Sequence, residues 1–369
     1  MIIGIFLEIL EIIVLFWIVK AIIYATKRGR IEKGVKEKDW YLQIFLSKED
    51  IISQFFFLFS VYFLGLTLLG FNKKLGGPLS WQTILLFTSI IGVVIAYYFK
   101  VIYTLTVSLI GIGAWWGVQG VEWIEKKDIK GSALLAGLLF IVTIFYLLGR
   151  AHEKEIKFKR FSMVYSILGL ISITVVLFFL STKSGLLYLE NITKGKSFLN
   201  SWEFTFSLFI FLIFLIGILV YTLSKNLVFK SEAVSIGFLV LLFCIIALLP
   251  EQKTFLQQKD YYEVYINGAQ LSNTGILWAI FFNILIFLEL VGIIFLGYLK
   301  QEDWLINLGV VFISLLILLK YFDWFFTFLN KSIFFIFGGI LLFVIGWLME
   351  KGRGYLLSTI KKESGSQNQ

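Results

Sequence analysis

Charged side chains, cysteine and histidine are all scarce in this 369-residue chain. Only 15% of the residues are charged, against roughly a quarter in an ordinary soluble domain, whereas 59% are hydrophobic. A soluble fold of this length could not bury so much apolar surface. The single cysteine, Cys244, excludes a disulfide within the chain. The single histidine, His152, argues strongly against a zinc site or a histidine-based catalytic triad.

Apolar runs of about twenty residues recur along the chain, and a helix of that length crosses a hydrocarbon core of roughly 30 Å. The runs do not alternate between polar and apolar residues, as the strands of a membrane barrel do. The sequence therefore predicts an all-α, polytopic transmembrane bundle of about eleven spans, between roughly ten and twelve. The predicted spans are 2–25, 51–70, 81–99, 101–118, 131–149, 161–181, 204–223, 233–249, 275–299, 304–319 and 332–349.

Basic residues between the spans predict the orientation of the chain. Alternate connections hold twenty Lys and Arg against twelve in the others, which favours an outside N-terminus and a cytoplasmic C-terminus. The predicted parts are an N-terminal membrane helix (1–25), a basic cytoplasmic linker (26–50), the multi-span bundle (51–349) and a cytoplasmic tail with a disordered end (350–369). The net charge of +9 fits helix ends that meet anionic headgroups, so no nucleic-acid partner is expected.

Polar residues at membrane depth are the candidate sites, because burying a charge there costs roughly 2.5–3.5 kcal/mol. Glu8 and Glu11 share one helix face; they either share a proton and hold a cation, or face water, headgroups or a partner helix. Glu289 is either a proton- or cation-linked carboxylate or a protonated group bonded to Ser, Thr or Asn of another helix. Asn283 is expected to form a hydrogen bond between helices.

Three connections receive their own interpretation. Residues 150–160, which include His152, are interpreted as a solvated segment that sets topology. In the connection 250–274, Asn267 and Gly268 predict a β-hairpin turn. Lys320, Tyr321 and Asp323 are predicted to form a polar turn before the last span, in which Asp323 pairs with Lys320. Glycines are expected at close helix contacts; they are Gly113, Gly117, Gly338, Gly339 and Gly346.

The C-terminal region, from an Asn-x-Gly span (Asn307, Gly309) through 320–323 to Arg353, resembles a family of bacterial membrane proteins. The family is known as domain of unknown function 2157, and the specific resemblance covers about fifty residues. That family often has Arg where this chain has Lys320. A bidentate contact from Arg to the aspartate is thereby replaced with a weaker point-charge pairing between Lys320 and Asp323. The resemblance implies a protein of the bacterial inner membrane and brings no established activity with it.

No catalytic motif is recognised, so an enzyme is not expected. Gly195-Lys196-Ser197 lacks the earlier glycine of a phosphate-binding loop, and neither HExxH nor GxSxG occurs. No cofactor or metal is predicted. The sequence favours a permease-like, small-molecule-handling protein of the inner membrane, whose partners are the bilayer and a small-molecule or ion ligand. The alternative is a non-catalytic envelope accessory or scaffold that binds partner membrane subunits.

Overall fold

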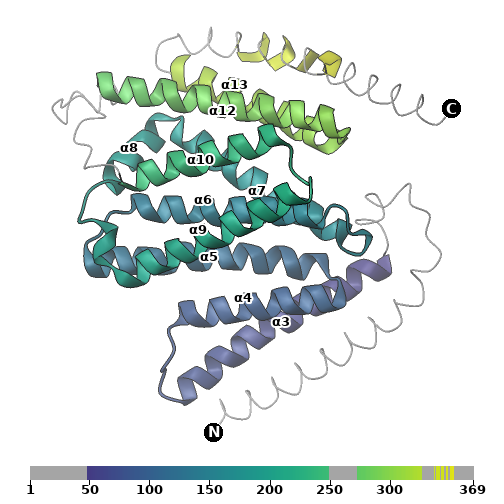
Figure 1. Ribbon diagram of the computed structural model, residues 1–369, viewed down its shortest axis with the longest axis vertical. Helices are drawn as coiled ribbons and strands as arrows, with labels where there is room; N and C mark the ends of the chain where they lie inside the picture. The colour runs from purple at the N-terminus through teal and green to yellow at the C-terminus, as the bar shows by residue number, and fades with distance from the viewer. Residues whose placement is uncertain are drawn as a thin grey trace. The chain divides into compact units, whose positions relative to one another are not determined.

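The computed structural model describes residues 48–248 and 272–325, with short pieces between 336 and 352 (Figure 1). Several predictions lie outside these residues, namely the first span with Glu8 and Glu11, the linker 26–47, the Asn267–Gly268 hairpin and the end of the tail. The last predicted span, 332–349, is described only in part.

Every regular element of the described residues is helical. The longer helices are α3 (Lys48–Lys74), α4 (Trp81–Phe99), α5 (Ile102–Lys127), α6 (Ser132–His152), α7 (Lys159–Leu180), α8 (Lys183–Ile192), α9 (Trp202–Ser224), α10 (Lys230–Leu248), α12 (Asn273–Lys300) and α13 (Asp303–Phe325). Two short 3₁₀ turns, Ile156–Phe158 and Phe198–Asn200, precede α7 and α9. Nine helices of the described part are long and apolar enough to span a membrane, and each matches a predicted span. The chain is thus a multi-pass membrane protein, and its described part is all-helical.

Several of these helices end in a left-handed residue that is not a glycine. Lys100 ends α4 in the left-handed conformation (φ 56°, ψ 43°), and the N–H of Val101 returns to the carbonyl of Ala96 at 3.0 Å. Asp128 and Gln301 end α5 and α12 in the same way, with φ of 52° and 56°. Helices α4 and α5, which are separated by only two residues, pack against each other.

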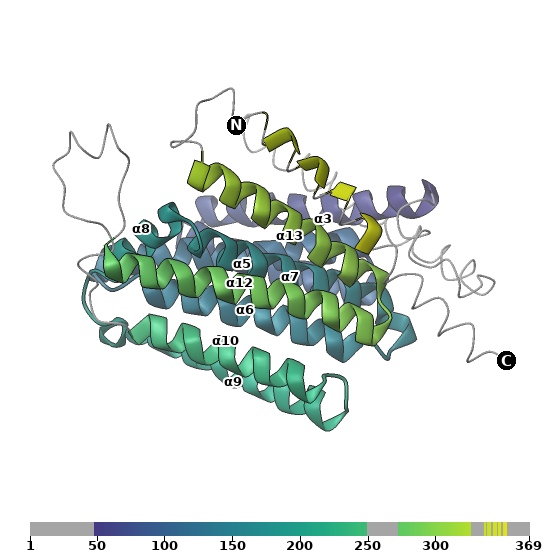
Figure 2. The same ribbon diagram turned by 90° about the horizontal axis from the view of Figure 1, so that it is seen from above.

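Two compact units make up the chain, and the division falls within α7, between Ile173 and Thr174. The first unit is centred on α6, of whose span 78% is buried, in contact with α5, α9 and α10. Figure 2 shows α9 and α10 running as a pair alongside α6. A Cβ atom on Gly137 would lie 2.2 Å from the buried ring of Trp116, and one on Gly169 2.7 Å from the Tyr146 nitrogen. Glycine at these positions lets the helices touch.

The prediction that Gly113 and Gly117 of α5 lie at close helix contacts is wrong for the described part of the chain. A Cβ atom on Gly113 or Gly117 would meet no atom within 4 Å in the described part of the chain. The spacing of four residues does put both on one face, but a neighbouring helix approaches α5 at Gly120, where a Cβ atom would lie 2.2 Å from Leu134. Spacing alone therefore did not identify the face that packs.

The second unit contains the end of α7, α8 as far as Asn191, and the hairpin of α12 and α13. The hairpin turns at Gln301, and the N–H of Glu302 donates to the carbonyl of Gly297 at 2.9 Å. Close contact follows at Gly297, whose added Cβ would lie 2.9 Å from the Ile306 nitrogen. The predicted polar turn 320–323 is wrong in its conformation, because α13 continues as helix to Phe325 and no helix-breaking residue interrupts it.

Candidate functional site

A corner between α7 and α8 gathers polar groups from three helices of the second unit. Helix α7 ends at Leu180, and the carbonyl of the buried Ser181 accepts hydrogen bonds from two side chains. Lys320 of α13 donates from Nζ at 2.5 Å, and Asn283 of α12 donates from Nδ2 at 3.2 Å. The last carbonyls of a helix lack partners within it and carry partial negative charge, so a cation there is stabilising. This corner therefore ties the α12–α13 hairpin to the end of α7.

A cavity of about 580 Å³ opens beside this corner. Its apolar wall is one face of α12, where Ile276, Ile280, Ile284 and Phe287 recur at helical spacing. The complete lining is Ser181, Lys183, Leu186, Ile276, Ala279, Ile280, Asn283, Ile284, Phe287 and Lys320. The volume falls within the range of about 300–1,000 Å³ that is typical of small-molecule sites. Of the described side chains, two with ammonium groups and none with a carboxylate contribute to the lining.

Glu289 lies deeper along α12 and is not part of this lining. Its Oε1 accepts a hydrogen bond of 2.8 Å from the hydroxyl of Thr174, which is fully buried on α7. Its Oε2 is buried and has no hydrogen-bond partner among the described residues. Glu289 is about 24 Å along α12 from the first residue, at 1.5 Å per residue. The contact is the one expected of a carboxyl group bonded to a hydroxyl of another helix.

Both contacts of α12 reach the C-terminal end of α7. Thr174 lies within the helix, and Ser181, seven residues further on, directly follows its last residue. On α12, Asn283 and Glu289 supply the partners for these two positions. The expectation that Asn283 bonds another helix agrees with its contact to Ser181.

The remaining predicted residues are only partly described. Lys320 contacts Ser181, and the Tyr321 ring would lie 3.2 Å from a Cβ atom on Gly338. The side chain of Asp323 lies outside the described residues, so its pairing with Lys320 stays a prediction. A Cβ atom on Gly339 or Gly346 would meet nothing within 4 Å in the described part.

A buried charge cluster in the first unit corrects the interpretation of residues 150–160. Arg150 is only 2% exposed, and its Nε contacts Glu232 Oε1 at 3.3 Å and the Tyr146 hydroxyl at 3.1 Å. Tyr146 also donates to Glu232, and Arg150 reaches Glu153 at 3.3 Å. The only sequence signal is that Tyr146 and Arg150 are four residues apart, on one helix face. Arg150 is thus part of the buried bundle and ties α6 to α10.

His152 is likewise packed rather than isolated in a solvated loop. Its Nδ1 lies 2.7 Å from the Leu148 carbonyl, and its Nε2 lies 3.1 Å from the Tyr97 hydroxyl. The Tyr97 hydroxyl donates in turn to Tyr165 at 3.2 Å, and the rings of His152 and Tyr165 stack. A carbonyl only accepts, so Nδ1 carries a hydrogen. The described residues contain no group of three or more His, Cys, Asp or Glu side chains suited to a metal ion.

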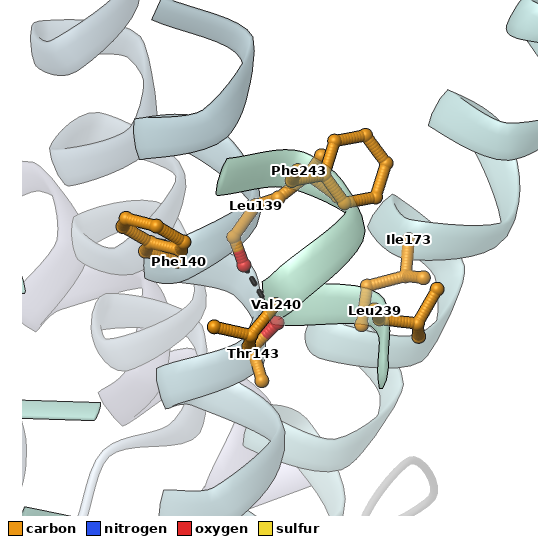
Figure 3. Close-up of a pocket in the computed structure, with 7 residues that line it drawn as sticks. All are labelled: Leu139, Phe140, Thr143, Ile173, Leu239, Val240 and Phe243. Atoms are coloured by element: carbon orange, nitrogen blue, oxygen red, sulfur yellow. Dashed lines mark hydrogen bonds between the residues drawn. The ribbon is translucent and has the colours of Figure 1, made fainter. Parts of the chain in front are cut away.

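A second, much smaller cavity lies within the first unit (Figure 3). It has a volume of about 10 Å³, close to the minimum that holds one water molecule, and its walls come from α6, α7 and α10. Thr143 is the one polar side chain of its lining, and its hydroxyl donates to the Leu139 carbonyl at 2.6 Å. This cavity is a packing void with no group left to bind a ligand.

Comparison of the chain with protein-family models, with curated proteins and with solved structures gives no match. The class of protein therefore follows from the helices themselves, which define a multi-pass integral membrane protein. The family resemblance of the C-terminal region stays a prediction.

Proposed function

We propose that this membrane protein is permease-like and handles a small molecule, which it binds in the cavity beside Ser181. One observation carries the proposal. Hydrocarbon walls of α12 meet a polar corner formed by Asn283, Lys320 and the carbonyl of Ser181. Small-molecule sites combine mostly apolar walls with a few placed polar groups, and this cavity has that composition.

Glu289 is assigned the role of a proton-carrying group that responds to the cavity. Its one described partner is a hydroxyl, and a proton on its buried Oε2 would change the charge of the α7–α12 contact. The side chain is not in the cavity lining, so direct contact with the ligand is not proposed. The link runs through the end of α7, which carries Thr174 and is directly followed by Ser181.

Filling the cavity tests the proposal. Ile280→Trp places a bulky ring in the lining, whereas Leu277→Trp, three residues earlier on α12, changes a side chain that is 68% exposed and outside the lining. We expect small molecules to co-purify with the wild type and with Leu277→Trp but to be lost from Ile280→Trp. Mass spectrometry of the denatured, purified proteins measures this retention.

Equal retention by all three proteins, with each correctly folded by its thermal transition in detergent, would rule out the cavity as the binding site. In that case the accessory or scaffold function would be favoured instead.

A further inference from the structure

The cavity beside Ser181 has a charge of one sign. Lys183 and Lys320 both line it, and among the side chains that the structure describes no Asp or Glu does. Lys183 is the first residue of α8 and is exposed. Lys320 belongs to α13; it is half-buried and contacts Ser181, just after the end of α7. Since membrane-facing sites carry a charge only at a cost, two lysines beside one cavity favour an anionic ligand.

Hydrocarbon dominates the rest of the lining. The apolar side chains of α12 form a trough from Ile276 to Phe287, eleven steps along the helix or about 16 Å at 1.5 Å per residue; they are Ile276, Ile280, Ile284 and Phe287. Leu186 of α8 adds a further apolar side chain. A small inorganic anion would leave this apolar wall uncovered, whereas a ligand with a long alkyl chain covers it. The lining therefore demands an anion that also has a hydrocarbon tail.

We infer that the ligand is an anionic glycerophospholipid of the surrounding bilayer. Its phosphate group lies between Lys183 and Lys320, with Asn283 as a further donor, and one acyl chain lies along Ile276 to Phe287. Basic pockets between membrane helices bind phosphate headgroups by the same charge complementarity. Bilayer lipid is also the amphiphile present at highest concentration around such a cavity. This inference rests on the proposed function, because it takes the cavity as the binding site.

Lipid retention by lysine variants tests the inference. Three proteins are compared: the wild type, Lys183→Gln and the control Lys73→Gln. Each is first reconstituted into nanodiscs of mixed phosphatidylglycerol and phosphatidylcholine and is then purified from them in mild detergent. Lys73 is exposed at the end of α3 and belongs to the first unit. We expect phosphatidylglycerol to be retained by the wild type and by Lys73→Gln, and to fall about tenfold in Lys183→Gln. Phosphatidylcholine should be retained weakly by all three.

Lipid retention is measured for Lys320→Gln as well. Because this change also removes a hydrogen bond to Ser181, its thermal transition is measured alongside to detect any loss of stability. Retention that does not depend on the headgroup or on Lys183 would overturn the lipid inference. The proposed function fails separately, because it requires only that Ile280→Trp expel whatever ligand the cavity holds. A fatty acid retained in place of phospholipid would likewise contradict the inference and leave the proposed function intact.

Discussion

At the scale of single residues, variants of Glu289 and Thr174 distinguish a structural role of their contact from a functional one. The hydroxyl of Thr174 donates to Glu289, and a glutamine at 289 would keep an oxygen in the same place to accept that bond. Hydrogen bonds between membrane helices contribute about 0.6 kcal/mol on average. A small stabilising contribution is therefore expected from this contact.

We expect Thr174→Val to lower the thermal transition of the purified protein slightly, by an amount equivalent to about 0.5–1.5 kcal/mol. Glu289→Gln should leave the transition nearly unchanged, because the hydrogen bond is retained. Ligand retention measured between pH 5 and pH 9 should vary with pH in the wild type and become flat in Glu289→Gln. A pH dependence that survives in Glu289→Gln would exclude Glu289 as the proton-carrying group.

Arg150 provides a second prediction about a single residue. Removing one partner of a buried ion pair costs about 3–5 kcal/mol, because the other charge is left without compensation. Arg150→Met should therefore strongly destabilise the protein, since the Glu232 side chain is only 7% exposed. Arg150→Met combined with Glu232→Gln should recover much of that loss. Thermal unfolding of both single variants and the double variant measures the coupling, and strictly additive losses would contradict it.

Sequence reasoning identified Glu289 and Asn283 because polar residues stand out within apolar runs. Arg150 and His152 were missed because they follow such a run, where basic residues usually mark a membrane surface. Their burial depends on Tyr97 and Glu232, which are distant in sequence. No local pattern reports those contacts, and the cavity likewise depends on three separate helices.

At the scale of helices, length and hydropathy predicted the nine described spans well. A span needs about twenty apolar residues, and this signal is strong in a single sequence. Helix α8 was not predicted, because ten residues, of which Gly185, Leu186 and Leu189 are buried, are too few to span a membrane. The left-handed helix ends at Lys100, Asp128 and Gln301 were not predicted either. Glycine is the usual residue at such a position, and none of these three residues is a glycine.

The corner between α7 and α8 depends on Gly185. A Cβ atom there would lie 1.8 Å from the Phe179 carbonyl oxygen, which belongs to the backbone and cannot move aside cheaply. We expect Gly185→Ala to lower the thermal transition and to weaken ligand retention, because the cavity contains Ser181 and Leu186 from this corner. Gly117→Ala is the matched control, in a mid-helix position where the new Cβ meets no atom within 4 Å.

The control variant should be neutral, or more stable by up to about 1 kcal/mol, because alanine favours helix more than glycine does. If Gly117→Ala proved as damaging as Gly185→Ala, the predicted packing role of Gly117 would be restored. A partner outside the described residues would then have to contact that face of α5.

At the scale of the whole molecule, orientation decides which side of the membrane the cavity serves. The bias of twenty basic residues against twelve predicts that the connections after α3, α5 and α7 face outward and that the connection between α6 and α7 faces the cytoplasm. The α7–α8 corner with Lys183 then lies toward the outer surface. A lipid bound there would come from the outer leaflet of the membrane.

A cysteine labelling experiment tests this orientation, because the chain has one native cysteine. Cys244 is half-buried within α10, and Cys244→Ala gives a background without thiols. Into it, Asn200→Cys and Glu155→Cys each place one thiol at an exposed position, between α8 and α9 and between α6 and α7 respectively. A membrane-impermeant maleimide should label Asn200→Cys in intact cells and Glu155→Cys only after the cells are permeabilised. The reverse pattern would invert the topology and place the Lys183 corner, with its ligand, on the cytoplasmic side.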